Sequence, residues 1–179
     1  MESTMNNNEI LIRLRYALDI KDSHMIEIFD LGGISVTKEE LQRILLNPKK
    51  DRSFEVDEDK FILDKDIKKC NNYMLEAFLN GFIIFKRGKQ DPNSLESNNH
   101  LFMIKDNKTV NNVMLKKIKI ALSLTSEDML DIFEASGSIL SKSELSAVLR
   151  REEHRNYKEC GDRYARNFLK GLTIKHRNI

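Results

Sequence analysis

The chain has 179 residues, of which 40% are hydrophobic, so it is long enough for one globular domain or two small ones with a buried core. Thirty Lys and Arg residues against 28 Asp and Glu leave a formal net charge of only +2, far below that of a dedicated polyanion binder. Two cysteines exclude a disulfide scaffold, and two prolines with seven glycines argue against an all-β architecture and favour helices.

Three short amphipathic helices are predicted at the start of the chain. The first keeps apolar residues at helical spacing on one face, and Asn8 is placed to act as its N-cap. The second begins near Asp22 and ends at Gly33. Thr37 and Glu40 then have the spacing of a capping box, in which each side chain accepts a hydrogen bond from a backbone N–H, so a third helix follows.

Residues 47–66 differ in character from the rest of the chain. Acidic and apolar residues alternate there, which favours either a short hairpin that packs on the body or an acidic loop. The acids from Asp57 onward begin like a calcium-binding loop, but Ile62 and Lys68 stand where that loop requires a glycine and a bidentate glutamate. We therefore predict no metal site in this segment.

A longer apolar pattern from Cys70 to Phe85 predicts a fourth helix. Gly81 lies inside this pattern, where glycine costs about 0.5 to 1 kcal/mol relative to alanine. We therefore expect another helix to approach closely at that point. Residues 90–110, which contain the turn-forming run DPNS, are predicted to be a linker.

The second half of the chain repeats the first. Residues 7–45 align without a gap on residues 111–149, and many of the paired residues are identical. After the insertion the match resumes and places Cys160 and Gly171 opposite the first cysteine and the first helical glycine. Such an order of identities indicates a tandem duplication.

The duplication predicts an all-α fold built from two copies of a four-helix unit. The first copy spans residues 7–89, with the insertion inside it, and the second spans 111–177. Asn112 repeats the predicted N-cap, and Ser141 with Glu144 repeats the capping box. We expect the two units to pack with pseudo-two-fold symmetry, so that the first and fourth helices of both share a core.

The repeated thiols, Cys70 and Cys160, are interpreted as core residues, because free cysteine packs as a small hydrophobic side chain. A nucleophile needs a lowered pKa and a neighbouring base. Arg163 follows the second thiol closely, but His154 has no counterpart in the first copy, and the four histidines lack the spacing of zinc ligands. We predict that the protein is not an enzyme and has no catalytic residues, cofactor or metal.

Basic residues of the more basic second copy are the candidate nucleic-acid contacts. Three of them are spaced i, i+3 and i+7 in the fourth helix, which predicts an exposed stripe that can follow a phosphate backbone. Tyr73, Glu76 and Asn80 stand at the matching positions of the first copy, so a solvated helix face is the alternative interpretation. The candidates are Lys116, Lys117, Lys119, Lys142, Arg150 and Arg151, followed by the stripe itself, Arg163, Arg166 and Lys170.

The second and third helices of each copy also resemble a helix-turn-helix, with Gly33 or Gly137 in the turn. The connection is longer than three or four residues, so plain helix packing is the alternative. A recognition helix would expose Lys38, Glu39, Gln42 and Arg43 in the first copy and Lys142, Ser143, Ser146 and Arg150 in the second.

The paired motifs, NNxxLxxxxxAL with MxxIF in each half and CxxxxxxxFLxG closing each, resemble the YehS family of small bacterial proteins over nearly the whole chain. This family has two tandem copies of a domain of unknown function. The resemblance therefore implies the duplication and a cytoplasmic bacterial setting, but no activity and no catalytic residues. It also implies a shorter connection where residues 47–66 lie in this chain.

These patterns favour a non-enzymatic binding or regulatory module that acts through helical surfaces, with a protein partner or by self-association. The alternative is a nucleic-acid-associated regulator that uses the basic face of the second copy. No apolar run reaches the length of about 18 residues that crosses a bilayer, and polar Asn residues interrupt the N-terminal region where a signal peptide is apolar. We therefore expect a cytoplasmic protein with no membrane contact.

Overall fold

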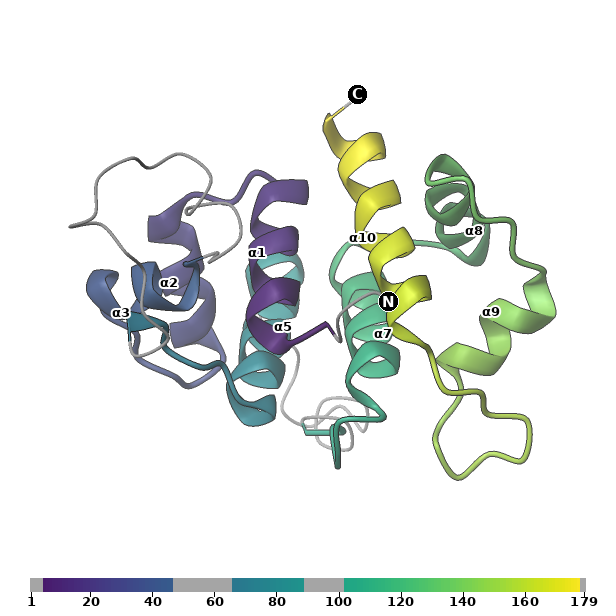
Figure 1. Ribbon diagram of the computed structural model, residues 1–179, viewed down its shortest axis with the longest axis horizontal. Helices are drawn as coiled ribbons and strands as arrows, with labels where there is room; N and C mark the ends of the chain where they lie inside the picture. The colour runs from purple at the N-terminus through teal and green to yellow at the C-terminus, as the bar shows by residue number, and fades with distance from the viewer. Residues whose placement is uncertain (1–4, 47–65, 89–101, 178–179) are drawn as a thin grey trace.

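The computed structural model describes residues 5–46, 66–88 and 102–177, and within these ranges the chain is helical and contains no strand (Figure 1). The described residues of each unit contain four helices, which confirms the predicted all-α duplication. The first unit contains α1 (Asn7–Ala17), α2 (Asp22–Leu31), α3 (Lys38–Ile44) and α5 (Asn72–Arg87). The second contains α7 (Val110–Ala121), α8 (Ser126–Ala135), α9 (Lys142–Leu149) and α10 (Asp162–Arg177).

The helix starts follow the predicted capping chemistry in part. Thr37 and Glu40 form the complete capping box of α3. At α9, Ser141 accepts a hydrogen bond from the backbone N–H of Glu144, while the Glu144 carboxylate accepts from the serine hydroxyl instead of its backbone. The prediction for Asn8 is wrong, because Asn6 caps α1.

Both α2 and α8 end at a glycine with left-handed backbone, as the sequence predicts. Gly33 has φ of +95° and Gly137 has φ of +89°. In each case the following residue donates its N–H to the carbonyl of the phenylalanine five positions earlier, which closes the helix with a Schellman motif. The chain is thereby turned back toward the core for α3 and α9.

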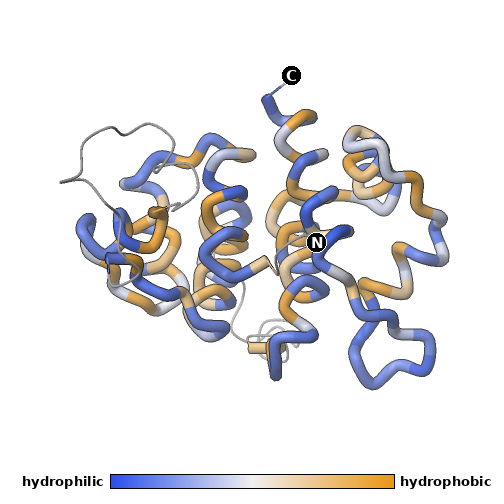
Figure 2. The backbone as a smooth tube through the Cα atoms, viewed as in Figure 1, coloured by the Kyte–Doolittle hydropathy of each residue, from blue (hydrophilic) through white to orange (hydrophobic). Residues whose placement is uncertain are grey.

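A central group of four helices joins the two units. In this group α1 packs on α10 and α5 packs on α7, so each main contact joins the first helix of one unit to the fourth helix of the other (Figure 1). The remaining helices flank this centre, with α2 and α3 on one side and α8 and α9 on the other. The arrangement matches the expected pseudo-two-fold packing. Figure 2 shows that apolar segments lie within the helices, whereas the connection from α9 to α10 is hydrophilic.

The four central helices run in the same direction. At their starts, Asn7 Nδ2 donates to Asn72 Oδ1 at 2.8 Å, and Asn111 Nδ2 donates to Asp162 Oδ1 at 2.9 Å. At the opposite end, the Nε of Arg177 in α10 donates to the carbonyl oxygen of Tyr16 in α1 at 2.9 Å. Their N-termini therefore lie at one end of the molecule and their C-termini at the other.

The two helical glycines mark close helix crossings, as predicted. A Cβ atom on Gly81 would lie 1.8 Å from the carbonyl oxygen of Ile28 in α2. In the second unit a Cβ atom on Gly171 would lie 1.8 Å from the carbonyl oxygen of Ile132 in α8. Because Ile28 and Ile132 are aligned in the two repeats, the same crossing is built twice.

A buried ion pair crosses the contact between α5 and α7. The Nζ of Lys117 lies 2.8 Å from Oε2 of Glu76, and the two side chains are only 3% and 2% exposed. Lys117 also donates to the side-chain oxygen of Asn80. The Glu76 carboxylate accepts the backbone N–H groups of Met103 and Ile104, which ties the segment before α7 to α5.

Two predicted segments fall largely outside the described residues. The hairpin or acidic loop within 47–66 lies there except for its last residue. Of the predicted linker, 90–110, only the part from residue 102 onward is described, and its last residue, Val110, already belongs to α7.

Candidate functional site

Each repeat contains a buried asparagine that ties three segments of the unit together. Nδ2 of Asn112 donates to the carbonyl oxygens of Val148 and Lys158 at 2.9 and 2.8 Å, and its Oδ1 accepts the N–H of Cys160 at 2.9 Å. The first repeat has the same three bonds, from Asn8 to the backbone of Ile44, Lys68 and Cys70. These repeated asparagines, which the sequence suggested as helix caps, therefore have a structural role, because they satisfy buried backbone groups of distant segments.

The repeated thiols lie in the core of their units. Cys70 and Cys160 are both buried and both precede the fourth helix of their repeat. Burial raises the pKa of each thiol to about 12, and Asp162 and Glu159 add to the effect at Cys160. Because the thiolate is the reactive form, neither cysteine is activated as a nucleophile.

The structure leaves only part of the candidate nucleic-acid contacts exposed. The prediction for Lys117 is wrong, because its side chain is buried against Glu76. The predicted stripe on α10 is also interrupted, since Arg166 is largely buried and its Nε lies 3.3 Å from Oε2 of Glu9 in α1. Of the other candidates, Lys142, Arg151, Arg163 and Lys170 are exposed, and Lys116, Lys119 and Arg150 are half-buried.

The residues proposed for a recognition helix are mostly at the surface. The four candidates of α3 are exposed, as are Lys142, Ser143 and Ser146 of α9, whereas Arg150 is half-buried at the end of α9. Lys142 lies 3.6 Å from the carboxylate of Glu127 in α8. The helix pairs are therefore accessible, but their charges are mixed in sign.

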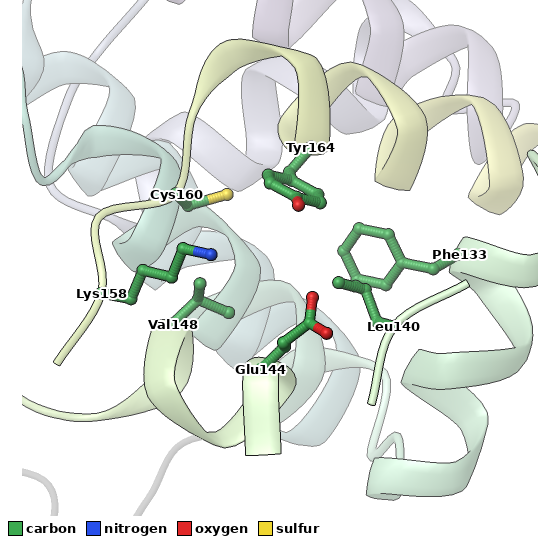
Figure 3. Close-up of a pocket in the computed structure, with 7 residues that line it drawn as sticks. All are labelled: Phe133, Leu140, Glu144, Val148, Lys158, Cys160 and Tyr164. Carbon is green, nitrogen blue, oxygen red and sulfur yellow. The ribbon is translucent and has the colours of Figure 1, made fainter. Parts of the chain in front are cut away.

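A small hollow lies at the surface of the second repeat, between α8, α9 and α10 (Figure 3). Figure 3 shows Lys158 and Glu144 directing their charged groups toward it, while Tyr164 covers another side. Its wall is otherwise mostly apolar. The lining residues are Phe133, Leu140, Glu144, Val148, Lys158, Cys160 and Tyr164.

The matching lysine and glutamate of the first repeat form an ion pair. There Lys68 contacts the carboxylate of Glu40, and this hydrogen bond lowers the pKa of Glu40. In the second repeat the matching lysine, Lys158, instead lies over the ring of Tyr164, with Nζ 5.8 Å from the ring centre. The first repeat has Met74 at the ring's position. The aromatic ring of the second repeat thus provides another partner for the lysine.

The lysine and glutamate of this site were missed from sequence, although a signal was present. Lys68 aligns with Lys158 and Glu40 aligns with Glu144, so each is identical in the two repeats. Glu144 was predicted only as a helix cap. The exchange of Met74 for Tyr164 is visible in the aligned sequences, but only the structure shows that Tyr164 lines the hollow.

The described residues contain no group of three or more His, Cys, Asp or Glu side chains arranged to hold a metal ion. None of the helices in the described part of the chain is long and apolar enough to cross a membrane.

Comparison with known proteins places the chain in a family. The model of a family described as "Protein of unknown function (DUF1456)" matches residues 7–88 and 111–178. The chain is also 31% identical over 172 residues to the "Uncharacterized protein YehS" of Escherichia coli (strain K12), and the match covers 96% of each chain. No solved structure matches. The two matched regions and this relative confirm the resemblance found in the sequence, and the chain belongs to the DUF1456 family.

Proposed function

We propose that this chain is a non-enzymatic binding module of the cytoplasm that acts through its helical surfaces, and that the shallow hollow of its second repeat is part of the surface that contacts an apolar side chain of a protein partner. The observation that carries this proposal is the difference between the repeats. Lys68 and Glu40 pair with each other in the first repeat, whereas Lys158 and Glu144 flank a shallow, mostly apolar hollow in the second. Apolar pockets bounded by a few polar groups are typical of recognition sites.

The chemistry around the hollow supports binding over catalysis. Cys160 is the strongest nucleophile in its wall, and burial raises the pKa of this thiol to about 12, so it stays protonated at neutral pH. Glu144 accepts a hydrogen bond from Ser141 at the start of α9, and Lys158 rests on an aromatic ring. These groups are arranged to contact a ligand rather than to activate one.

The proposal is tested with isobutanol, whose alkyl group has the shape of a leucine side chain. Titration of the full chain, followed by the backbone amide signals in NMR spectra, should give saturable shifts at Leu140, Glu144 and Lys158. The matching first-repeat residues, Glu40 and Lys68, provide the internal control and should not shift, because they pair with each other.

A filled variant supplies the second control for this titration. Val148→Met adds volume to the wall of the hollow and should abolish the saturable shifts while leaving the helical circular dichroism spectrum unchanged. Shifts that do not saturate, or that are equal in the two repeats, would refute the hollow as a side-chain acceptor.

Nucleic-acid binding is a second candidate function, and the charge at one end of the molecule favours it. The central helices all direct their C-termini to this end, where basic side chains complement the helix dipoles. The basic residues in these last turns are Arg15, Lys86, Arg87, Lys119, Lys175, His176 and Arg177. Two of them are engaged locally, since Arg15 pairs with Asp22 and Arg177 with Asp19.

The second candidate is tested by fluorescence anisotropy with a labelled double-stranded DNA of mixed sequence. Binding through phosphates should weaken steeply as the salt concentration rises, and Lys119→Glu with Lys175→Glu should abolish it. Arg163→Glu with Lys170→Glu provides the matched test of the face predicted from sequence. Absence of binding at low salt would eliminate this candidate.

A further inference from the structure

The pseudo-two-fold axis of the molecule runs along its central helices. It exchanges α1 with α7 and α5 with α10, and it carries the contact of α1 with α10 onto that of α5 with α7. Because these four helices run in the same direction, only an axis parallel to them can make this exchange. One of the two points at which the axis meets the surface is therefore the end that carries the four C-termini (marked C in Figure 1).

Basic side chains are repeated across the axis at this end. The last turns of the central helices hold three pairs of aligned positions at which both repeats have a basic residue. The pairs are Arg15 with Lys119, Lys86 with His176, and Arg87 with Arg177. The stripe predicted on α10 has no such repeat.

Compensation of helix dipoles does not by itself explain where these charges lie. A basic side chain in the last turn stabilises any helix, yet α2, α8 and α9 end without one. Among the flanking helices of the described chain, α3 alone has a basic last turn, with Arg43. The basic last turns are thus concentrated in the helices whose ends share one surface.

On one side of the axis the basic side chains have acidic neighbours. Arg15 lies 2.8 Å from Asp22, and Arg177 lies 3.6 Å from Asp19. All four side chains are at least 30% exposed, and pairs that water reaches are weak, so a phosphate oxygen can replace either carboxylate. The guanidinium of Arg177 also lies over the ring of Tyr16, 4.2 Å from its centre, which holds the cation in place.

The other side of the axis lacks these carboxylates. Ser123 and Ser126 stand at the positions of the two aspartates. Ser123 has φ of +53° and Asp19 has φ of +51°, so this left-handed turn does not require an aspartate. Lys119 and Arg87 form no ion pair with a residue of the described part of the chain.

The symmetry and size of this end fit a nucleic-acid duplex. The antiparallel strands of DNA are related by two-fold axes, and proteins with a matching axis place equivalent groups against both strands. Packed helices lie about 8 to 10 Å apart, so the ends of four of them span roughly 20 Å. This width is enough to reach both backbones that border a groove about 12 Å wide.

We propose that the C-terminal end of the central helices binds the backbone of double-stranded DNA, with the last turns of α1 and α10 on one strand and those of α5 and α7 on the other. This inference rests on the second candidate function, because it names the nucleic acid and its orientation on that surface. Contacts to phosphates carry no sequence information, so the binding is independent of sequence.

The test is fluorescence anisotropy of the full chain with a short labelled duplex and with the single strand of the same length. The duplex should bind at least about tenfold more tightly, because it offers phosphates to both sides of the axis. Lys119→Gln with Arg87→Gln should lower the slope of log affinity against log salt by about 2, as expected for two lost phosphate contacts. Arg163→Gln with Lys170→Gln makes the same change in net charge elsewhere and should leave binding unchanged.

A second pair of variants should strengthen binding. Asp19→Ser with Asp22→Ser installs the residues of the second repeat and removes the carboxylates that compete with phosphate, so the affinity at low salt should rise at least about tenfold. Glu27→Ser with Asp30→Ser removes two other exposed carboxylates and is the matched control. It should have little effect, because these residues lie farther along α2.

Equal affinities for the duplex and the single strand would overturn the inference. So would equal effects of each variant and its matched control, because the net charge of the chain would then explain them. Either result, with binding still present, would leave nucleic-acid binding in place as the second candidate function. Absence of binding to both nucleic acids at low salt would remove the inference and that candidate together.

Discussion

Removing one partner of the buried pair between Glu76 and Lys117 should destabilise the protein strongly. The pair lies inside the contact between the two repeats, and neither side chain is more than 3% exposed. Burial lowers the pKa of Lys117, while the hydrogen bond and the charge of Glu76 act in the opposite direction. The lysine therefore depends on the glutamate to remain charged in a place without water.

The expected magnitude follows from what each substitution leaves behind. Glu76→Gln keeps an oxygen for the backbone N–H groups of Met103 and Ile104 but removes the negative charge beside the buried ammonium of Lys117. Lys117→Met leaves a buried carboxylate that retains those two donors. Each change should lower the free energy of unfolding by about 3 to 5 kcal/mol, with the lysine change at the lower end.

The double variant distinguishes a buried ion pair from simple loss of packing. Glu76→Gln with Lys117→Met removes both charges, and the new amide can donate to the side-chain oxygen of Asn80. It should therefore be more stable than either single variant and lie within about 2 kcal/mol of the wild type. Urea unfolding followed by far-UV circular dichroism measures all four proteins.

The pseudo-symmetric contact supplies the control for this cycle. Arg166 in α10 pairs there with Glu9 in α1, and these side chains are 17% and 28% exposed. Arg166→Gln should cost about 1 kcal/mol or less, as is usual for pairs that water reaches. Costs below about 1 kcal/mol for both single changes at the buried pair, or a double variant whose cost is the sum of the two, would refute the reasoning.

Three further predictions concern the framework of the repeats. Asn112→Ala should lower the free energy of unfolding by about 3 kcal/mol, because three backbone groups lose their partner in the core; a cost below about 1 kcal/mol in urea unfolding would contradict this. Gly171→Ala should cost at least about 3 kcal/mol because of the clash in the helix crossing. Gly161→Ala, which enters open space, should be close to neutral, and equal costs for the two glycine changes would show that the crossing is not tight. Burial raises the pKa of Cys70 and Cys160 from 9.0 to about 12, so the folded chain retains thiol protons that the unfolded chain releases, and the melting temperature should fall as the pH rises through this interval. Replacing both thiols by alanine should flatten that fall, and an unchanged slope would assign it to other groups.

The fold was predictable because the duplication repeats each apolar and glycine position that the helical unit needs. An apolar position in one helix is weak evidence for a core, but the same position repeated in an aligned copy, as with Phe78 and Phe168, is much stronger. The glycines at 81 and 171 are a similar case. A helical glycine costs stability, so its presence in both copies indicated the crossing that the structure shows.

The candidate site was less predictable, because its properties depend on contacts between distant segments. In the sequence, Lys117 has the spacing of a surface residue on a basic helix. The carboxylate with which it pairs in the core, Glu76, comes from the other repeat. The role of Asn8 was misassigned because an asparagine at the start of a helix satisfies the pattern of a cap whether it bonds to that helix or across the core. Lys158 lies over the ring of Tyr164, which comes from a separate helix, whereas the aligned Lys68 pairs with Glu40.

The two contacts between the repeats show how the duplicated unit has become asymmetric. At one contact the fourth helix supplies a carboxylate, Glu76, whereas at the other it supplies a cation, Arg166, in the aligned position. Pairing the second repeat with another second repeat would bring Lys117 against Arg166 and place two cations in a low-dielectric contact. When the first repeat pairs with the second repeat of the same chain, Lys117 and Arg166 each face a glutamate instead. The charge of the central helices therefore commits the repeats to each other.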